Sequence, residues 1–130
     1  MSNRLIEIVN EMYAALPATD WETFQSHMHP DFCVVEADTL PMAGTFAGLE
    51  GFQELVGVVF GMFSEFIPEV RDMAVSDNRV MVWVDMTLTG AKSGKTVHTP
   101  MIEVFSFEGE KVTEIRPFYF DTDLIASIVD

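Results

Sequence analysis

The first third of the chain carries apolar side chains at the spacing of amphipathic helices. Within residues 3–16 they lie three or four positions apart, at Leu5, Ile8, Val9, Met12, Tyr13 and Leu16. This period predicts a helix that ends before Pro17. Thr19 and Glu22 have the spacing of a capping box, which predicts a short second helix up to about His27.

The middle of the chain contains loop residues and one strong apolar stripe. We expect a turn at 29–31, a first strand over 32–37 and a loop over 39–48, where prolines and glycines interrupt the sequence. The stripe after the loop predicts a helix up to about Phe66, closed by Pro68. Its apolar positions are Leu49, Phe52, Leu55, Val56, Val59, Phe60 and Phe63.

The remainder of the chain favours strands. We expect strands over 69–75 and 79–88, then a hairpin over 98–121 whose turn contains Gly109. A last short helix is expected over 122–129. The order of the main elements, α-α-β-α-β-β-β-β, places helices early and antiparallel strands late, which is typical of an α+β domain.

Composition limits the possible functions. The 130 residues suffice for one domain with a substantial core, and 48% of them are hydrophobic. We expect part of this apolar surface to serve a cavity or a partner subunit. The chain has 21 acidic residues against 7 basic ones, a net charge of −14. This charge repels phosphate backbones and anionic lipids, so we expect no nucleic acid and no membrane as partner.

The cysteine and histidine content argues against disulfides and metals. Cys33 is the single cysteine, so an intrachain disulfide is impossible. The N-terminal segment is amphipathic and carries Glu7 and Glu11, unlike a signal peptide, and we expect a cytoplasmic protein. His27 and His29 are spaced so that their rings do not converge on one ion. We therefore expect neither a metal nor another cofactor.

Two motifs resemble those of a known family. They are Leu40-Pro41-x-Ala43-Gly44-x-Phe46-x-Gly48 and the ending Arg116-x-Phe118-Tyr119-Phe120-Asp121. With the order of the elements, they are similar to the SnoaL-like branch of the NTF2-like superfamily, which includes ketosteroid isomerases, polyketide cyclases and limonene-type epoxide hydrolases. The resemblance implies a cone, a curved antiparallel sheet wrapped around the N-terminal helices, with an internal apolar pocket. Many members are homodimers that pair through the outer face of the sheet.

The resemblance makes Asp121 the first candidate for a catalytic base. Polyketide cyclases and epoxide hydrolases of the superfamily use an aspartate at the end of this strand. The preceding Phe118–Phe120 is expected to surround the carboxylate and raise its pKa. The alternative interpretation is that Asp121 caps the helix that follows.

The strand over 79–88 supplies the next candidates. Alternation places Trp83 and Asp85 on one face, which we expect to line the cavity, with Asp85 as a second acid. Trp83 stands where epoxide hydrolases have an arginine, which argues against that hydrolysis, and Asp85 could instead lie on the surface. The other face is an apolar row that packing alone would explain, and it also favours a homodimer that buries an apolar sheet face: Val80, Val82, Val84, Met86 and Leu88.

Further candidates come from other segments. His98 is a possible donor to an enolate oxygen, and Tyr13 matches roughly the phenolic donor of ketosteroid isomerases. Either side chain could instead serve packing alone. Asp38 is the rival base, because those isomerases place the base just before the Pro/Gly loop, here Glu36-Ala37-Asp38. Its register is off by about one residue, so it ranks below Asp121. The predicted substrate contacts are Phe46, Phe60, Trp83, Met101 and Tyr119.

These features predict a cofactor-free enzyme of the isomerase or cyclase type. In it an aspartate acts as general base on a hydrophobic carbonyl substrate. The alternative is a non-catalytic module of the same fold, which binds a hydrophobic small molecule or works through dimerisation. The sequence does not identify the substrate.

Overall fold

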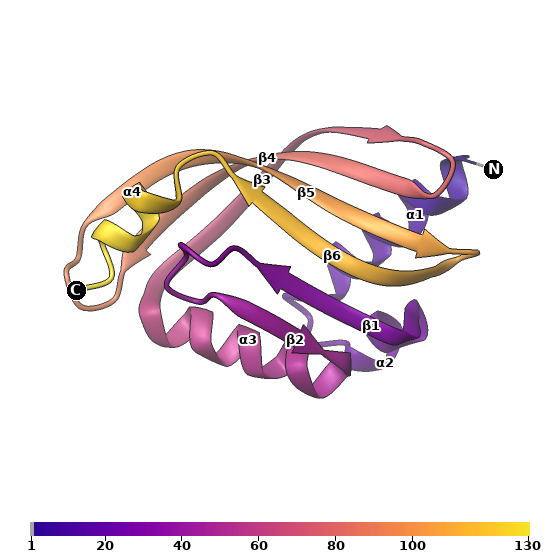
Figure 1. Cartoon of the computed structure of the whole chain (residues 1–130), viewed down its shortest axis with the longest axis horizontal. Coiled ribbons are helices and arrows are strands. Elements are labelled where there is room, and N and C mark those ends of the chain that lie inside the picture. Colours follow the sequence, from indigo (N-terminus) through magenta and orange to yellow (C-terminus); the bar gives the residue numbers. More distant parts are fainter. Residues whose placement is uncertain (1) are drawn as a thin grey trace.

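One curved sheet organises the chain in a computed structural model that describes residues 2–130 (Figure 1). The mixture of helices and sheet confirms the predicted α+β class. The elements are α1 (Ser2–Ala15), α2 (Trp21–Ser26), β1 (Met28–Glu36), β2 (Gly44–Ala47), α3 (Gly48–Met62), β3 (Phe63–Val75), β4 (Arg79–Gly90), β5 (Thr96–Glu108), β6 (Lys111–Tyr119) and α4 (Thr122–Ser127).

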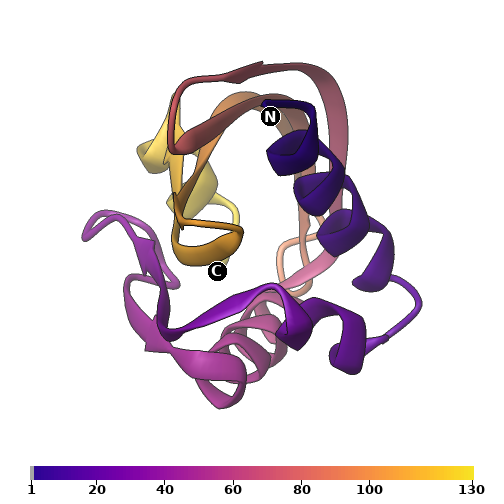
Figure 2. The same ribbon diagram turned by 90° about the vertical axis from the view of Figure 1, so that its right-hand side faces the viewer.

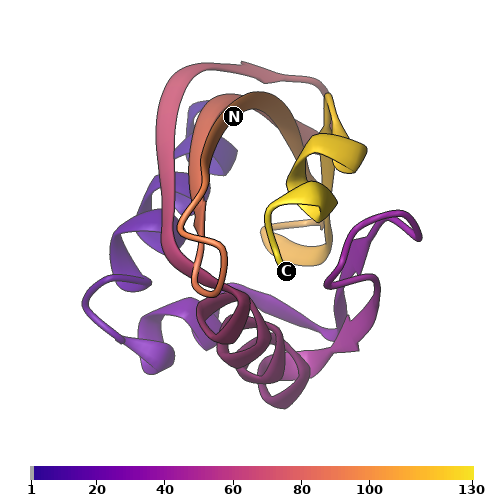
Figure 3. The ribbon, with the colours of Figure 1, turned by 90° about the vertical axis from the view of Figure 1, so that its left-hand side faces the viewer.

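The six strands form a single sheet in the order β2-β1-β6-β5-β4-β3. All neighbours are antiparallel except β1 and β6, which pair in parallel. Seen from its two ends, the sheet curls around an interior that α1 and α3 help to enclose (Figures 2 and 3). The sheet therefore has an inner face toward the helices and an outer face away from them.

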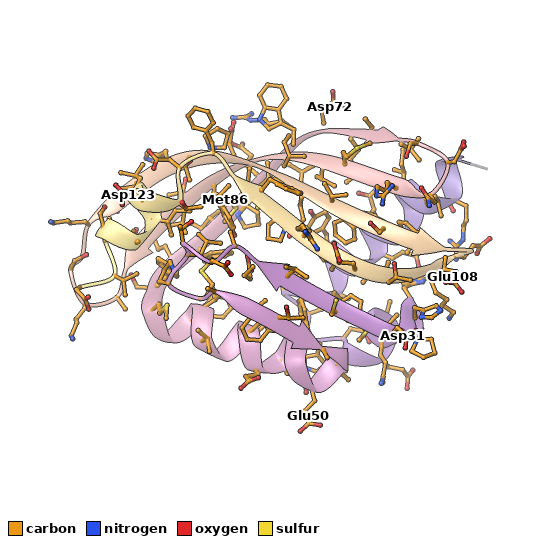
Figure 4. The ribbon with its side chains drawn as sticks, in the orientation of Figure 1. Asp31, Glu50, Asp72, Met86, Glu108 and Asp123 are labelled. Carbon is orange, nitrogen blue, oxygen red and sulfur yellow. The ribbon has the colours of Figure 1, made fainter. Side chains whose placement is uncertain are left out.

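The inner face of β4 is the apolar row from Val80 to Leu88. All five side chains of this row are at most 1% exposed within a single chain. The expectation that this row packs against a partner subunit is therefore wrong, because the helices and the rest of the sheet already cover it. Figure 4 shows Met86 of this row within the fold, whereas the labelled carboxylates, such as Asp31 and Glu50, lie at the periphery.

The helix-to-strand boundary in the middle of the chain differs from the prediction. The helix α3 ends at Met62, and Phe63 already has the extended angles φ −124° and ψ 130°. The apolar stripe continues past this point because Phe63 packs in the core as the first residue of β3. Pro68 lies within β3, which tolerates it because β3 is an edge strand.

Two shorter segments also differ from the prediction. The predicted turn at 29–31 belongs to β1, and part of the predicted loop forms the edge strand β2. The second helix is capped by Asp20, whose carboxylate accepts a hydrogen bond from the Thr23 N–H at 3.1 Å. The predicted capping box at Thr19 does not form, because Thr19 has the left-handed φ of 52°.

The helices also bear on membrane contact. No helix within residues 2–130 is both long enough and apolar enough to cross a membrane.

Candidate functional site

A group of four polar side chains points toward the inner face of the sheet. We call this group the inner cluster: Tyr13, Glu36, Glu103 and Tyr119. Glu36 ends β1 and continues the inward positions of Phe32 and Val34, which are buried. Glu103 lies on β5 between the buried Met101 and Phe105, which share its face. The two-residue period of each strand thus points a carboxyl group toward the interior.

The register of the sheet brings the two carboxyl groups to one level. Glu103 pairs with Pro117 on β6, and Val34 pairs with Ile115 on the other side of β6. Continued by two residues, the parallel register places Glu36 level with Pro117. Neighbouring strands lie ~4.8 Å apart, so the two glutamate backbones are ~10 Å apart with β6 between them. Their side chains project from the same face of the sheet, one on each side of β6.

Tyr13 on α1 closes one side of the inner cluster. Its phenolic hydroxyl donates to Oε1 of Glu103 at 2.5 Å, and its ring packs edge-on against Phe105 at 5.6 Å between centroids. Burial first, and then the charge of Glu103, raise the pKa of Tyr13 far above its ordinary value. Tyr13 is therefore a hydrogen-bond donor at every physiological pH.

Burial also favours the protonated form of Glu103. It raises the pKa of this carboxyl group, and the hydrogen bond from Tyr13 opposes the shift in part. A protonated carboxyl group has an O–H that can donate. Tyr13 and Glu103 form a hydrogen-bonded pair on one side of the interior, and Glu103 can also donate in its protonated form.

Glu36 faces this pair from β1. It is only 6% exposed, and its Oε1 has no hydrogen-bond partner among the described residues. Burial, and next the charge of Glu103, raise the pKa of Glu36 to about 8. A buried carboxyl group with an unsatisfied oxygen is costly in a purely structural role, and a pKa near the working pH suits a general base.

Tyr119, at the end of β6, completes the cluster. Burial first, then Glu36 and Glu103, raise the pKa of Tyr119 well above its ordinary value. Tyr13, Glu103 and Tyr119 point inward, yet each keeps part of its surface accessible.

The structure places Asp121 at the start of α4. Its carboxylate accepts a hydrogen bond from the Leu124 N–H at 2.9 Å, which is the geometry of a helix N-cap. Phe118 and Phe120 are 56% and 82% exposed, so neither ring forms a buried aromatic wall. The expected aromatic enclosure of Asp121 is therefore wrong, and its alternative interpretation as a cap describes the geometry.

Asp85 and Trp83 lie on the outer face of the sheet. Asp85 accepts a hydrogen bond from Arg71 Nε at 2.7 Å, and Trp83 is 51% exposed. The expectation that they line the cavity is wrong, because Val82 and Val84 take the inward positions of β4.

The other predicted residues are divided between the interior and the surface. His98 also faces outward, with Nδ1 3.0 Å from the Thr87 hydroxyl. Asp38 lies exposed beyond the end of β1, and Phe60 of α3 is 63% exposed. Phe46 packs against the core from β2, and Met101 is buried beside Glu103 on the inner face.

Sequence reasoning named Tyr13 and Tyr119 of the inner cluster but not its carboxyl groups. A signal for both was present, since each glutamate occupies an inward position of an alternating strand. Glu36 follows Phe32 and Val34, and Glu103 stands between Met101 and Phe105. A carboxyl group at such a position is the feature to search for.

Two hollows in the molecular surface lie away from the inner cluster. One of about 370 Å³ is bounded by Met62 and Ala91, and another of about 470 Å³ lies on the outer face of the sheet. Neither hollow is bounded by a member of the inner cluster. The inner cluster is the candidate site because of its inward carboxyl groups, the unsatisfied Glu36 oxygen and the raised pKa values.

Comparison with known families agrees with the fold. The model of the SnoaL-like domain matches residues 9–115. The chain belongs to the SnoaL-like family. This confirms the resemblance drawn from the two sequence motifs. A comparison with curated proteins gave no match.

Solved structures of SnoaL-like and NTF2-like proteins superpose closely on the chain. An NTF2-like protein from Burkholderia xenovorans is 21% identical, with a TM-score of 0.90 over 100% of this chain and 98% of that one. A protein proposed to be a SnoaL-like polyketide cyclase, from a Jannaschia species, is 19% identical with a TM-score of 0.81, over 99% and 94% of the chains. A Catenulispora acidiphila protein of ketosteroid isomerase-like fold, in complex with trimethylamine, is 17% identical with a TM-score of 0.75, over 95% and 94%. These similarities establish that the chain has the NTF2-like fold.

Proposed function

We propose that this SnoaL-like protein is a cofactor-free enzyme that transfers a proton at the carbon next to a carbonyl group, as isomerases and cyclases do. The observation that carries the proposal is the placement of Glu36 opposite the Tyr13–Glu103 pair on the inner face. Glu36 takes the role that sequence reasoning gave to Asp121. The arrangement parallels ketosteroid isomerase, which combines a carboxylate base with a tyrosine and a protonated carboxylic acid as donors.

The first step forms an enolate. The substrate carbonyl oxygen accepts hydrogen bonds from Tyr13 and from protonated Glu103, the tyrosine hydrogen being redirected from Glu103 to the substrate. The Glu36 carboxylate takes the proton from the neighbouring carbon, and the C–H electron pair moves to the carbonyl oxygen. Both donors strengthen their hydrogen bonds as negative charge develops on that oxygen, which lowers the barrier.

The second step decides between the two reaction types. In an isomerase, Glu36 returns its proton to a different carbon of the same enolate. In a cyclase, the enolate carbon attacks an electrophilic carbonyl carbon of the same molecule, and the new alkoxide takes up the proton that Glu36 removed, which regenerates the Glu36 carboxylate. Neither route consumes an oxidant or a second substrate.

The interior supports a neutral, hydrophobic carbonyl compound as the substrate. Met101 and Phe105 flank Glu103 with apolar surface. The net charge of −14 and the two carboxyl groups of the inner cluster repel anions. A hydrophobic ketone satisfies both conditions.

Hydrogen–deuterium exchange tests the proposal without knowledge of the natural substrate. A panel of neutral hydrophobic ketones is incubated with the protein in D₂O, and loss of the α-proton signals is followed by NMR. The wild type should accelerate exchange in at least one ketone, and Glu36→Gln should remove the acceleration. Asp38→Asn, an exposed carboxylate two residues further on, is the matched control. Equal rates for Glu36→Gln and wild type would overturn the assignment of Glu36 as base.

A second candidate function is the binding of a cationic amine without catalysis. The Lys and Arg side chains of residues 4–130 lie at the surface or only partly buried, so no buried cation balances the carboxyl groups of the inner cluster. The trimethylamine bound by the Catenulispora acidiphila protein supports this candidate. Tetramethylammonium, a permanent cation, should then bind more tightly as the pH rises through 8 and Glu36 ionises. Affinity independent of pH would exclude it.

The proposal includes a homodimer that forms through the outer face of the sheet. An exposed row crosses three strands there, because Trp83 pairs with Ile102 and Ile102 pairs with Phe118. Large apolar side chains in adjacent positions on a sheet surface favour contact with another protein. This row, which we call the outer row, replaces the Val80–Leu88 row as the predicted interface.

A further inference from the structure

The outer face of the sheet carries a second polar arrangement, independent of the inner cluster. A hollow of about 470 Å³ lies over β4, β5 and β6. Arg79 pairs with Ser106 and Ser106 with Glu114, while Val104 pairs with Arg116. Two guanidinium groups therefore border one small depression on a protein whose net charge is −14.

The two arginines of this hollow differ in how they are satisfied. Arg116 holds Glu114 with two hydrogen bonds, at 2.9 and 3.1 Å. Arg79 donates from Nε to the Ser106 hydroxyl at 3.3 Å, and within residues 4–130 no carboxylate oxygen lies within 4.0 Å of its guanidinium. Arg4 and Arg71, in contrast, each pair with acidic side chains. Arg79 therefore lines the hollow without an acidic partner among residues 4–130.

The other walls of the hollow define what would fit beside Arg79. The Thr113 hydroxyl already donates to the Ser106 carbonyl oxygen at 3.2 Å, while Val104 and Phe118 supply apolar surface. A guanidinium group matches the geometry of a carboxylate, to which it donates two parallel hydrogen bonds. Glu114 repels further negative charge, so a single carboxylate is favoured over a phosphate dianion.

We infer that the hollow beside Arg79 binds a small monocarboxylate with an aromatic or other flat apolar body. The carboxylate pairs with the Arg79 guanidinium and the Ser106 hydroxyl, and the apolar body lies against Phe118 and Val104. The volume of the hollow is within the range of small-molecule sites, ~300–1,000 Å³. Arg79 lies four residues from Trp83 of the outer row along β4, ~13 Å, and Phe118 belongs both to that row and to the wall of the hollow.

Titration calorimetry with benzoate tests this inference, and benzamide is the neutral probe of the same shape. Wild type should bind benzoate and not benzamide. Arg79→Gln should weaken benzoate binding about tenfold or more, as expected for loss of a charge-assisted pair. Arg71→Gln is the matched control, because Arg71 lies on the same face but already holds Asp85 and Glu69. It should bind benzoate as the wild type does.

Other outcomes would overturn the inference. Equal benzoate affinity in Arg79→Gln and wild type, or no heat from wild type at millimolar benzoate, excludes the site. If Arg79→Gln instead weakens self-association in light scattering while benzoate never binds, the carboxylate comes from a second copy of the chain. Benzoate binding lost in Glu36→Gln would place the ligand in the inner cluster. The result is independent of α-proton exchange, so each proposal can fail without the other.

Discussion

The phenolic hydroxyl of Tyr13 donates a hydrogen bond of 2.5 Å to Glu103, a residue 90 positions later in the sequence. This contact joins α1 to β5 across the interior of the cone. It also leaves one donor and one carboxyl group side by side, facing Glu36. The proposed chemistry depends on this relationship, so the first prediction concerns Tyr13.

Tyr13→Phe should weaken the proposed activity and raise the pKa of Glu103. The hydrogen bond from Tyr13 lowers that pKa, so its loss removes the opposing effect. Loss of one oxyanion donor should slow α-proton exchange ~10²-fold or more. Exchange rates and a carboxyl titration by infrared or NMR spectroscopy check both effects. Tyr119→Phe is the control, because the Tyr119 hydroxyl makes no side-chain hydrogen bond among the described residues, and an equal loss in both variants would contradict the role of Tyr13.

The stability of the protein should fall as the pH rises through 8. The folded-state pKa of Glu36 is about 8, above its ordinary value of 4.5, so the native state holds this proton more tightly than the unfolded state. That stabilisation is complete below about pH 4.5 and is lost between there and 8, at up to ~1.4 kcal/mol per pH unit. Glu36→Gln should remove most of this dependence. Urea unfolding of both proteins at pH 5 and pH 8.5 measures it, with Asp38→Asn as control.

Asp121 should contribute to stability and not to proton transfer. Asp121→Ala removes the acceptor for the Leu124 N–H and should lower the free energy of unfolding by ~1 kcal/mol. Asp121→Asn keeps a capping oxygen and should cost less. Thermal unfolding and α-proton exchange are compared for both variants. Loss of exchange in Asp121→Asn, with stability unchanged, would restore Asp121 as the base.

The outer row should hold a homodimer together. Ile102→Lys introduces a charge at the centre of the row and should convert a dimer into a monomer, which light scattering at micromolar concentration detects. Phe60→Lys is the control, because Phe60 is at least as exposed but lies on α3, away from the sheet face. A wild-type protein that is already monomeric would contradict the proposal.

Much of the fold could be predicted from the sequence, because local periods record it. The apolar spacing of residues 3–16 matches α1, and the alternation over 79–88 matches the two faces of β4. Alternation does not say which face is inward, since that depends on where the helices pack. The more uniformly apolar row, from Val80 to Leu88, took the interior, and Trp83 was left outside.

The candidate site was harder to predict, because its members are distant in the sequence. Arg71 comes from a different strand than Asp85, and only the pairing of β3 with β4 reveals that this acid is satisfied at the surface. Glu36 and Glu103 similarly become neighbours only through β6. The order of the elements and the two motifs together indicated the family, but Asp121 in the second motif could be either a base or a cap. The backbone of α4 favours the cap.

The parallel pairing of β1 with β6 has a consequence for synthesis on the ribosome. The strand β1, which carries Glu36, can pair with β2 as soon as β2 has been translated, since a short connection joins the two strands. Its other neighbour, β6, is among the last segments to be translated, and Val34 then pairs with Ile115 from the far end of the chain. A contact of such long range is slow to form. The carboxyl group proposed as the base therefore meets its donors only when translation is almost complete, and a truncated chain lacking β6 should have no proton-transfer activity at all.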